Sequence, residues 1–135
     1  MASLEDYTEE KTEVIYGAEN IINSTLQALS RCKSQVDNCI DSSAPSMFVI
    51  PNHPITNSFQ ELKRRGIRLR LIAEITKDNI SYCKDLIKIF ELRHLDEVKG
   101  NFGIADGKYY AASAKSRESS PPPLLIDSTL RPLVE

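Results

Sequence analysis

The chain has 135 residues, 41% of them hydrophobic and 27% charged, and its formal net charge is −2 at pH 7. This length suits one domain with a core of its own, and the small net charge gives no general attraction to nucleic acid or anionic membranes. No apolar run approaches the roughly 18 residues of a transmembrane helix, so no membrane segment is expected.

The cysteine pattern bears on the cellular compartment. The chain has three cysteines, Cys32, Cys39 and Cys83, and no two of them form a C-x-x-C pair. This pattern predicts neither a disulfide framework nor a metal site such as zinc, and it fits the reducing cytoplasm. Cys32 and Cys83 repeat within apolar helical stripes, so we expect both to pack in the core as small hydrophobic residues. The position of Cys39 stays open.

Hydrophobic spacing separates helices from strands along the chain. In chain order the predicted elements are a helix at 15–32, a strand at 36–41, a buried strand or irregular core segment at 47–50, a helix at 54–65, a strand at 67–75, a helix at 79–90, hairpin strands at 101–106 and 108–114, a strand at 123–128 and the start of a helix at 129–135. Pro54 and Asp78 are placed to start helices, and Gly66 is placed to end one. The strand at 67–75 should border solvent in its first half and be buried in its second.

Together these elements predict an α/β fold, a mixed β-sheet covered by helices. Asp106-Gly107 predicts a two-residue hairpin turn, and the low-complexity segment 114–123 predicts a mobile loop. We expect a polar leader at 1–13 that could be disordered, one domain at 14–129, and the start of a linker helix at 130–135. The regular apolar ending indicates a fragment of a longer protein.

The order of elements resembles one half of a phospholipase D-like domain: a strand, a helix ending in "RRG", the strand "IRLRLI", a helix and a hairpin with Asp-Gly at its tip. That superfamily carries H-x-K-x-x-x-x-D on the first hairpin strand. Placing its aspartate on Asp106 puts Lys99 at the histidine position and Asn101 at the lysine position. Neither residue replaces an imidazole that attacks phosphorus and exchanges a proton near neutral pH, so no catalytic residue is predicted.

A second resemblance covers nearly the whole of residues 12–135. The block "EITKDNISYCKDLIKIFELRHLDEVKGNFGIADGKYYAASA", with "EVIYGAENIINSTLQALSRCKSQVDNCID" before it and "LRPLVE" after it, resembles the N-terminal sensor region of archaeal histidine kinases. The resemblance implies that "LVE" continues into a helix leading to a kinase core, where ATP would bind. The chain itself has no glycine-rich phosphate loop and no phosphoacceptor histidine within a dimerisation helix, so it should need no cofactor.

The first functional interpretation is therefore a non-catalytic sensory or interaction domain of a two-component sensor histidine kinase. Binding of an unknown small-molecule or protein signal would shift the helix that begins at Leu130 and so reach the C-terminal kinase core. A homodimer is expected, with no nucleic acid partner. Two alternatives stay open: a phosphodiesterase or nuclease-like domain completed by dimerisation, using His53 or His94, and the ligand-binding domain of an archaeal transcriptional regulator.

Eight residues are candidates for ligand binding: Glu74, Thr76, Asn79, Tyr82, His94, Lys99, Asn101 and Asp106. The first four follow a strand and enter a helix, where ligands collect in open α/β sheets, although 76–79 is also an ordinary capping sequence. His94 lies in the charged segment 91–99, which fits either proton sensing or a solvated surface with weak ion pairs. The last three occupy the motif positions.

A run of basic residues at 63–70 could hold phosphate or nucleic acid. Its members are Lys63, Arg64, Arg65, Arg68 and Arg70. Gly66 reverses the chain in the middle of the run, so the charges should divide between a helix end and a strand. We therefore expect a solvated face here rather than an anion site.

Overall fold

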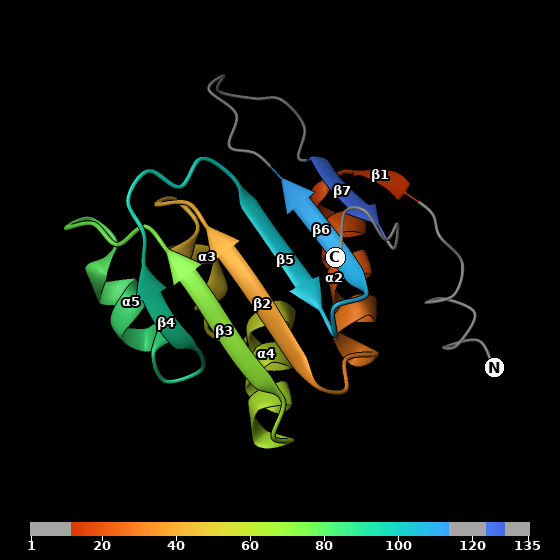
Figure 1. Ribbon diagram of the computed structural model, residues 1–135, viewed down its shortest axis with the longest axis horizontal. Coiled ribbons are helices and arrows are strands. Elements are labelled where there is room, and N and C mark those ends of the chain that lie inside the picture. The colour runs from red at the N-terminus through yellow and green to blue at the C-terminus, as the bar shows by residue number, and fades with distance from the viewer. Residues whose placement is uncertain (1–11, 114–123, 129–135) are drawn as a thin grey trace.

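The computed structural model describes residues 12–113 and 124–128, the last five by their backbone alone. Within this part the strands form one seven-stranded sheet in the order β1-β7-β6-β5-β2-β3-β4 (Figure 1). The strands are β1 (Thr12–Tyr16), β2 (Gln35–Ile40), β3 (Arg68–Ala73), β4 (Glu91–His94), β5 (Asn101–Ala105), β6 (Tyr109–Ser113) and β7 (Leu124–Ser128). β2, β3 and β4 are parallel and the other neighbours are antiparallel, so the sheet is mixed, as predicted.

The described helices lie on one face of this sheet (Figure 1). They are α2 (Ala18–Ser30), α3 (Pro45–Phe48), α4 (Pro54–Arg64) and α5 (Ile80–Leu86). Leu29, Phe59 and Leu86 from three of the helices form one buried cluster with Leu69 and Leu71 of β3. The core therefore lies between the helices and one side of the sheet, and no described helix covers the other side.

Helix α4 shows how local sequence sets an element. Pro54 occupies its first turn, and the Nδ1 atom of His53 accepts a hydrogen bond from the backbone N–H of Ile55 at 3.1 Å. This caps one of the free N–H groups at the helix start. Gly66 follows the helix with a φ of 81°, the left-handed conformation that glycine adopts without strain. The predicted start and stop of this helix are confirmed.

Strand β3 alternates along its whole length. Leu69, Leu71 and Ala73 are buried, whereas Arg68, Arg70 and Ile72 face solvent. The expectation of a second half buried on both faces is wrong, because Ile72 is 40% exposed. The helices cover only one face of the sheet, so period-two alternation continues to the strand end.

Three further boundaries differ from the sequence expectations. The first helix begins at Ala18 rather than Ile15, because Gly17 has a φ of 89° and Ile15 pairs with Leu125 of β7. Strand β1 thus includes Thr12 and Glu13, which were expected in the leader. The apolar segment at 47–50 is preceded and partly formed by the short helix α3, which Pro45 starts.

The second half of the chain also departs from expectation at two places. Helix α5 has Asn79 rather than Asp78 at its N-cap position, and it ends at Leu86, although Phe90 still packs in the core. The charged segment 91–99, for which no regular element was predicted, contains strand β4, which pairs with β3. This four-residue edge strand has a single apolar residue, Leu92, so it shows too little alternation to be recognised from sequence.

The β5–β6 hairpin is confirmed, with one correction to its turn. Asp106 and Gly107 both have positive φ, and the N–H of Lys108 donates to the carbonyl of Ala105 at 3.0 Å. The register pairs Ala105 with Tyr109, so three residues rather than two connect the strands. Strand β7 is also as predicted, whereas residues 1–11, the loop at 114–123 and the helix from Leu130 lie outside the described residues.

Candidate functional site

The carboxyl ends of β2, β3 and β4 meet the start of β5 at one edge of the sheet (Figure 1). The predicted candidates Glu74, His94 and Asn101 stand at these strand ends, and Thr76 and Asn79 follow in the next turn. Glu74, Thr76 and Asn79 thus lie beyond a strand end, where the topological rule expects ligands to collect; whether they bind one stays a prediction. Their hydrogen bonds decide what they can do there.

The buried side chain of Asn79 links the loops at these strand ends. It is 4% exposed, its Oδ1 accepts from the N–H of Thr76 at 2.8 Å, and its Nδ2 donates to the carbonyls of Ser42 at 3.0 Å and Glu74 at 2.8 Å. Both donor hydrogens of the amide are used. Asn79 therefore joins the β2 and β3 loops and has no donor left for a ligand.

Asp41 and Asn101 form a second link. The N–H of Asp41 donates to Oδ1 of Asn101 at 2.8 Å, and Nδ2 of Asn101 donates to Oδ2 of Asp41 at 3.2 Å. Ser43 donates from its N–H and its hydroxyl to the other oxygen of Asp41. Sequence reasoning did not single out Asp41, because its role depends on a partner 60 residues away.

Glu74 and His94 hold neighbouring loops in the same way. Glu74 Oε1 accepts from the N–H of Val98 at 3.1 Å. His94 accepts from the N–H of Ile75 at its Nδ1, at 3.0 Å, and its Nε2 lies 2.7 Å from a carboxylate oxygen of Asp96. An accepting Nδ1 leaves the proton on Nε2, which donates to the carboxylate. These groups are thus engaged in internal contacts.

Asp106 lies at the opposite end of the strands, beside the start of β2. Its two carboxylate oxygens accept from the backbone N–H groups of Lys33, Ser34 and Gln35 at 2.8–3.1 Å, and from the Ser34 hydroxyl. Burial alone would raise the pKa of Asp106, but these hydrogen bonds outweigh it and lower the pKa to about 2. Such a carboxylate in a ring of backbone donors stabilises a turn.

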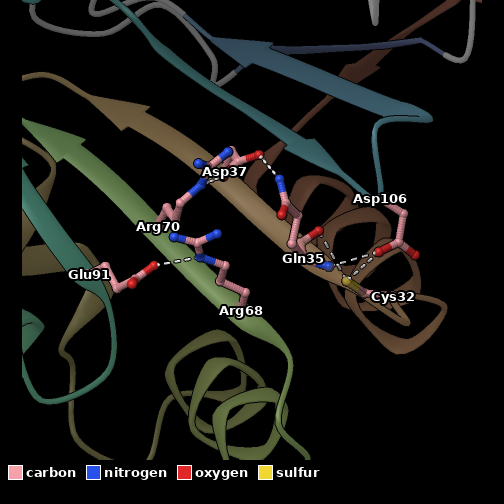
Figure 2. Close-up of polar contacts among 7 residues, drawn as sticks. All are labelled: Cys32, Gln35, Asp37, Arg68, Arg70, Glu91 and Asp106. Carbon is pink, nitrogen blue, oxygen red and sulfur yellow. Dashed lines mark hydrogen bonds and ion pairs between the residues drawn. The ribbon is translucent and has the colours of Figure 1, made fainter.

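The neighbouring thiol of Cys32 donates to Asp106 at 3.3 Å (Figure 2). Burial, followed by the hydrogen bond to this carboxylate, raises the pKa of Cys32 to about 12. Cys32 and Cys83 are buried as predicted, and Cys39 is buried as well. An un-ionised, buried thiol is a poor nucleophile, so none of the three is suited to catalysis.

The three motif positions do not converge. Lys99 and Asn101 stand at the beginning of β5 and Asp106 follows its end, so the five-residue strand, at about 3.3 Å per residue, separates them. Lys99 is exposed, and Tyr82 is 42% exposed on α5. In the described part of the chain, no group of three or more His, Cys, Asp and Glu side chains could hold a metal ion.

The uncovered side of the sheet, which we call the open face, carries a row of charges (Figure 2). Glu91, Arg70 and Asp37 are neighbours in register across β4, β3 and β2. Arg70 forms an ion pair with Asp37, and Arg68 forms one with Glu91 at 2.9 Å. The hydrogen bond from Arg70 lowers the pKa of Asp37, and that from Arg68 lowers the pKa of Glu91.

The basic run therefore divides as expected. Lys63 and Arg64 lie in the last turn of α4, whereas Arg68 and Arg70 lie on the open face in pairs with acidic residues. This arrangement is a solvated face rather than an anion site.

A second row on the open face is apolar. Ile72, Cys39, Phe102 and Ala112 are cross-strand neighbours in β3, β2, β5 and β6. Ile72 is 40% and Phe102 44% exposed, and together they flank the buried Cys39. A contiguous apolar row beside charged residues is typical of a surface that binds another protein.

Comparison with known proteins bears on the fold. No family model and no curated protein match the chain. Among solved structures, TrmBL2, an archaeal chromatin protein with a novel mode of DNA binding, matches 96% of this chain and 49% of its own, with a TM-score of 0.63 and 17% identity. The phosphatidylserine synthase of Haemophilus influenzae matches 93% of this chain and 35% of its own, with a TM-score of 0.53 and 9% identity.

The chain thus spans about half of TrmBL2 and about a third of the synthase. Neither neighbour is a histidine kinase, so the kinase part of the sequence interpretation stays a prediction. No helix in the described part is both long and apolar enough to cross a membrane. The structure establishes a mixed α/β fold, and both solved neighbours share it over most of this chain.

Proposed function

We propose that this chain is a non-catalytic interaction domain of a regulatory protein, and that its open face docks a second copy of the same chain. The observation that carries the proposal is the pair of rows on that face, the apolar row of Ile72 and Phe102 and the charged row of Glu91, Arg70 and Asp37. No described helix covers either row.

Charge complementarity favours a second copy as the occupant. The charged row contains both signs, so a copy turned about a two-fold axis can set its acidic residues against basic residues of the first. The apolar row supplies area whose removal from water favours association. A partner of strongly single-signed charge would meet repulsion on part of this face.

The proposal that this domain is non-catalytic rests on the hydrogen bonds of its two histidines. His53 uses Nδ1 to cap α4, and His94 uses Nδ1 to hold the N–H of Ile75. A nucleophilic imidazole needs an unprotonated ring nitrogen whose lone pair is free to attack phosphorus. The alternative of a phosphodiesterase predicts hydrolysis of bis(p-nitrophenyl) phosphate that disappears in His53→Ala or His94→Ala. We expect wild type and both variants to show only the background rate.

The parent protein belongs, in this proposal, to one of two regulatory classes. The likeness to TrmBL2 favours the transcriptional-regulator alternative, whereas the block 74–114 resembles the sensor region of archaeal histidine kinases. TrmBL2 binds DNA, so the transcriptional-regulator alternative conflicts with the expectation that this chain has no nucleic acid partner. Fluorescence anisotropy with a DNA duplex tests this chain directly, and its net charge of −2 predicts no binding at physiological salt.

The docking proposal is tested by sedimentation equilibrium. Wild type should dimerise reversibly, and the double variant Ile72→Asp and Phe102→Asp should be monomeric with an unchanged circular dichroism spectrum. Ile87→Asp is the matched control, because Ile87 is 60% exposed at the C-cap of α5, away from the open face. A monomeric wild type at high concentration, or a double variant that dimerises as well as the control, would show that the open face is not the interface.

A further inference from the structure

A histidine joins the two loops that follow β3 and β4. The loop at 74–79 leads from β3 to α5, and the loop at 95–100 leads from β4 to β5. His94, the last residue of β4, accepts the backbone N–H of Ile75 at its Nδ1 atom, and Ile75 packs against the core. His94 is the register neighbour of the buried Ala73, so this bond lies on the helix-covered side of the sheet, away from the open face.

This bond exists only while the imidazole is neutral. A neutral imidazole has one nitrogen with a free lone pair and one N–H, whereas an imidazolium has an N–H on both nitrogens. In the charged ring two N–H groups would face each other where Nδ1 meets Ile75, so the bond is lost. Histidine is the side chain whose charge ordinarily changes between about pH 5 and 8, and bonds between backbone groups do not titrate in that range.

The other ring nitrogen keeps its partner in both charge states. Nε2 of His94 lies 2.7 Å from Oδ1 of Asp96, and it carries a proton in the neutral ring as well as in the charged one. The Asp96 side chain is 88% exposed, so water screens its attraction for a positive ring. Protonation therefore breaks the contact with Ile75 while Asp96 still holds the ring.

No other charged side chain replaces the contact with Ile75. The elements beside His94 carry these titratable or charged groups: Arg93 on β4, Arg68 and Arg70 on β3, Glu74, Lys77 and Asp78 after β3, Glu97 and Lys99 after β4, and Tyr82, Lys84 and Asp85 on α5. Within residues 12–113, Asp96 is the only acidic side chain with a hydrogen bond or ion pair to the ring. Glu74 instead accepts from the N–H of Val98.

The loop at 95–100 is strained between its contacts. Glu97 has a φ of 59°, a left-handed conformation that is uncommon for a residue with a side chain. Such a conformation costs free energy and persists only where the surrounding structure enforces it. On either side of Glu97, Asp96 is bound to His94 and Val98 is bound to Glu74. The junction between the two loops thus depends on a few side-chain contacts, and one of them requires a neutral histidine.

We propose that His94 is a pH-sensitive latch, which joins the loop at 74–79 to the end of β4 while it is neutral and releases that loop when it is protonated. The released segment includes Glu74 and Thr76, at the strand ends where ligands collect in open α/β sheets. The latch goes beyond the docking role and lies off the open face, so the two proposals can fail separately.

The amide proton of Ile75 reports the state of the latch. Hydrogen exchange of the 15N-labelled chain, followed by NMR at pH 8 and pH 5, gives protection factors corrected for the intrinsic effect of pH. The protection factor of Ile75 should fall roughly two- to tenfold on acidification, the effect of one hydrogen bond. Thr76 is the internal control, because its N–H donates to the amide oxygen of Asn79, which does not titrate, and its protection should not change.

Two matched variants separate the two histidines. In His94→Asn the amide oxygen takes about the place of Nδ1 and accepts at either pH, so the protection of Ile75 should no longer depend on pH. His53→Asn keeps a capping acceptor at the start of α4 and should leave the pH dependence of Ile75 as in wild type. The wild-type measurement tests the latch even if His94→Asn does not fold.

Four results would overturn the latch: constant protection of Ile75 in wild type, a pH dependence that persists in His94→Asn, an equal fall at Thr76, or a proton on Nδ1 of His94 at pH 8 in long-range 1H–15N spectra. The exchange is measured at a concentration where the chain is monomeric. A chain that never dimerises would refute the docking proposal and leave these results unchanged.

Discussion

The hydrogen bonds to Asp106 predict a specific loss of stability in Asp106→Asn. In wild type both carboxylate oxygens accept, one from the N–H of Lys33 and the other from the N–H groups of Ser34 and Gln35. An asparagine has one acceptor oxygen, so its NH2 group must face at least one backbone donor. The contact between the β5–β6 turn and the start of β2 therefore loses its negative charge and at least one hydrogen bond.

The magnitude follows from the pKa of Asp106, which falls from the usual 3.8 to about 2. Each pKa unit corresponds to about 1.4 kcal/mol, so the ionised form contributes roughly 2 kcal/mol at neutral pH as an upper value. Asp106 is partly exposed, and solvent screening reduces this to about 1–2 kcal/mol. Each kcal/mol corresponds to about 3–6 °C in Tm for a domain of this size.

The sign of the pH dependence is fixed because the folded state has the lower pKa. The contribution is fully present above pH 4 and is lost as the pH falls through about 2. Urea denaturation at pH 7 and at several pH values between 4 and 2 should show the difference between wild type and Asp106→Asn narrowing with acid. Asp78→Asn, at an exposed position, is the control and should change stability by less than about 0.5 kcal/mol. A pH 7 difference as small as that of the control, or one that is constant down to pH 2, would refute the reasoning.

Three further predictions concern the rest of the fold. Asn79→Ala should cost about 2–4 kcal/mol in chemical denaturation, because it leaves two partly buried carbonyls and a partly buried N–H without the Asn79 side chain as their partner. Asn57→Ala, at an exposed position, should cost less than about 0.5 kcal/mol, and similar losses for both variants would contradict the structural role of Asn79. The thiols of Cys32, Cys39 and Cys83 should resist iodoacetamide at pH 8 in the native state and react on unfolding, because burial raises the pKa of each. Mass spectrometry follows the labelling, and rapid labelling of the native protein would show that the helices open. A double-mutant cycle with Asp37→Asn and Arg70→Gln, measured at a protein concentration where the chain is monomeric, should give a small coupling to folding that disappears at high salt. A large coupling that persists in the monomer at high salt would contradict the exposed position of this ion pair.

The sequence predicted best those elements whose signals are local. Helix α4 has its starting proline, its buried stripe of Phe59 and Leu62, and its terminating Gly66 within 13 residues. The β5–β6 hairpin was likewise recognised from Asp106-Gly107 and the strands beside it, although the register added one residue to the turn. Helix caps and tight turns depend on neighbours along the chain, so their residues reveal them.

The missed elements are those that depend on distant partners. Ile15 continues a helical spacing in the sequence, yet it pairs with Leu125 in the strand ladder between β1 and β7. Strand β4 reads as a charged connection, and only its pairing with β3 makes it a strand. Backbone hydrogen bonds between strands can outweigh local preference, because each strand edge must find a partner.

The candidate residues show the same division. Sequence alone predicted that Lys99 and Asn101 stand where a phosphodiesterase would need histidine and lysine. It also placed Glu74 and Asn79 just after a strand end, but it could not show that His94 lies beside them or that the polar atoms of all three form hydrogen bonds that hold loops. Those contacts join residues up to tens of positions apart, so they exist only after folding.

The sequence by itself determined the class of the fold and the local helices and turns, and its resemblance to a phospholipase D-like domain led to the expectation that the motif positions carry no catalytic histidine or lysine. Only the tertiary structure decided which side of the sheet stays open, which places Ile72 and Phe102 in one apolar row beside the paired charges. It also decided that the Nδ2 atom of Asn38 is buried without a hydrogen-bond partner among the described residues. The physical reason is that burial and hydrogen-bond partnership are properties of residues brought together by folding, whereas periodicity and chemical type are already present along the chain.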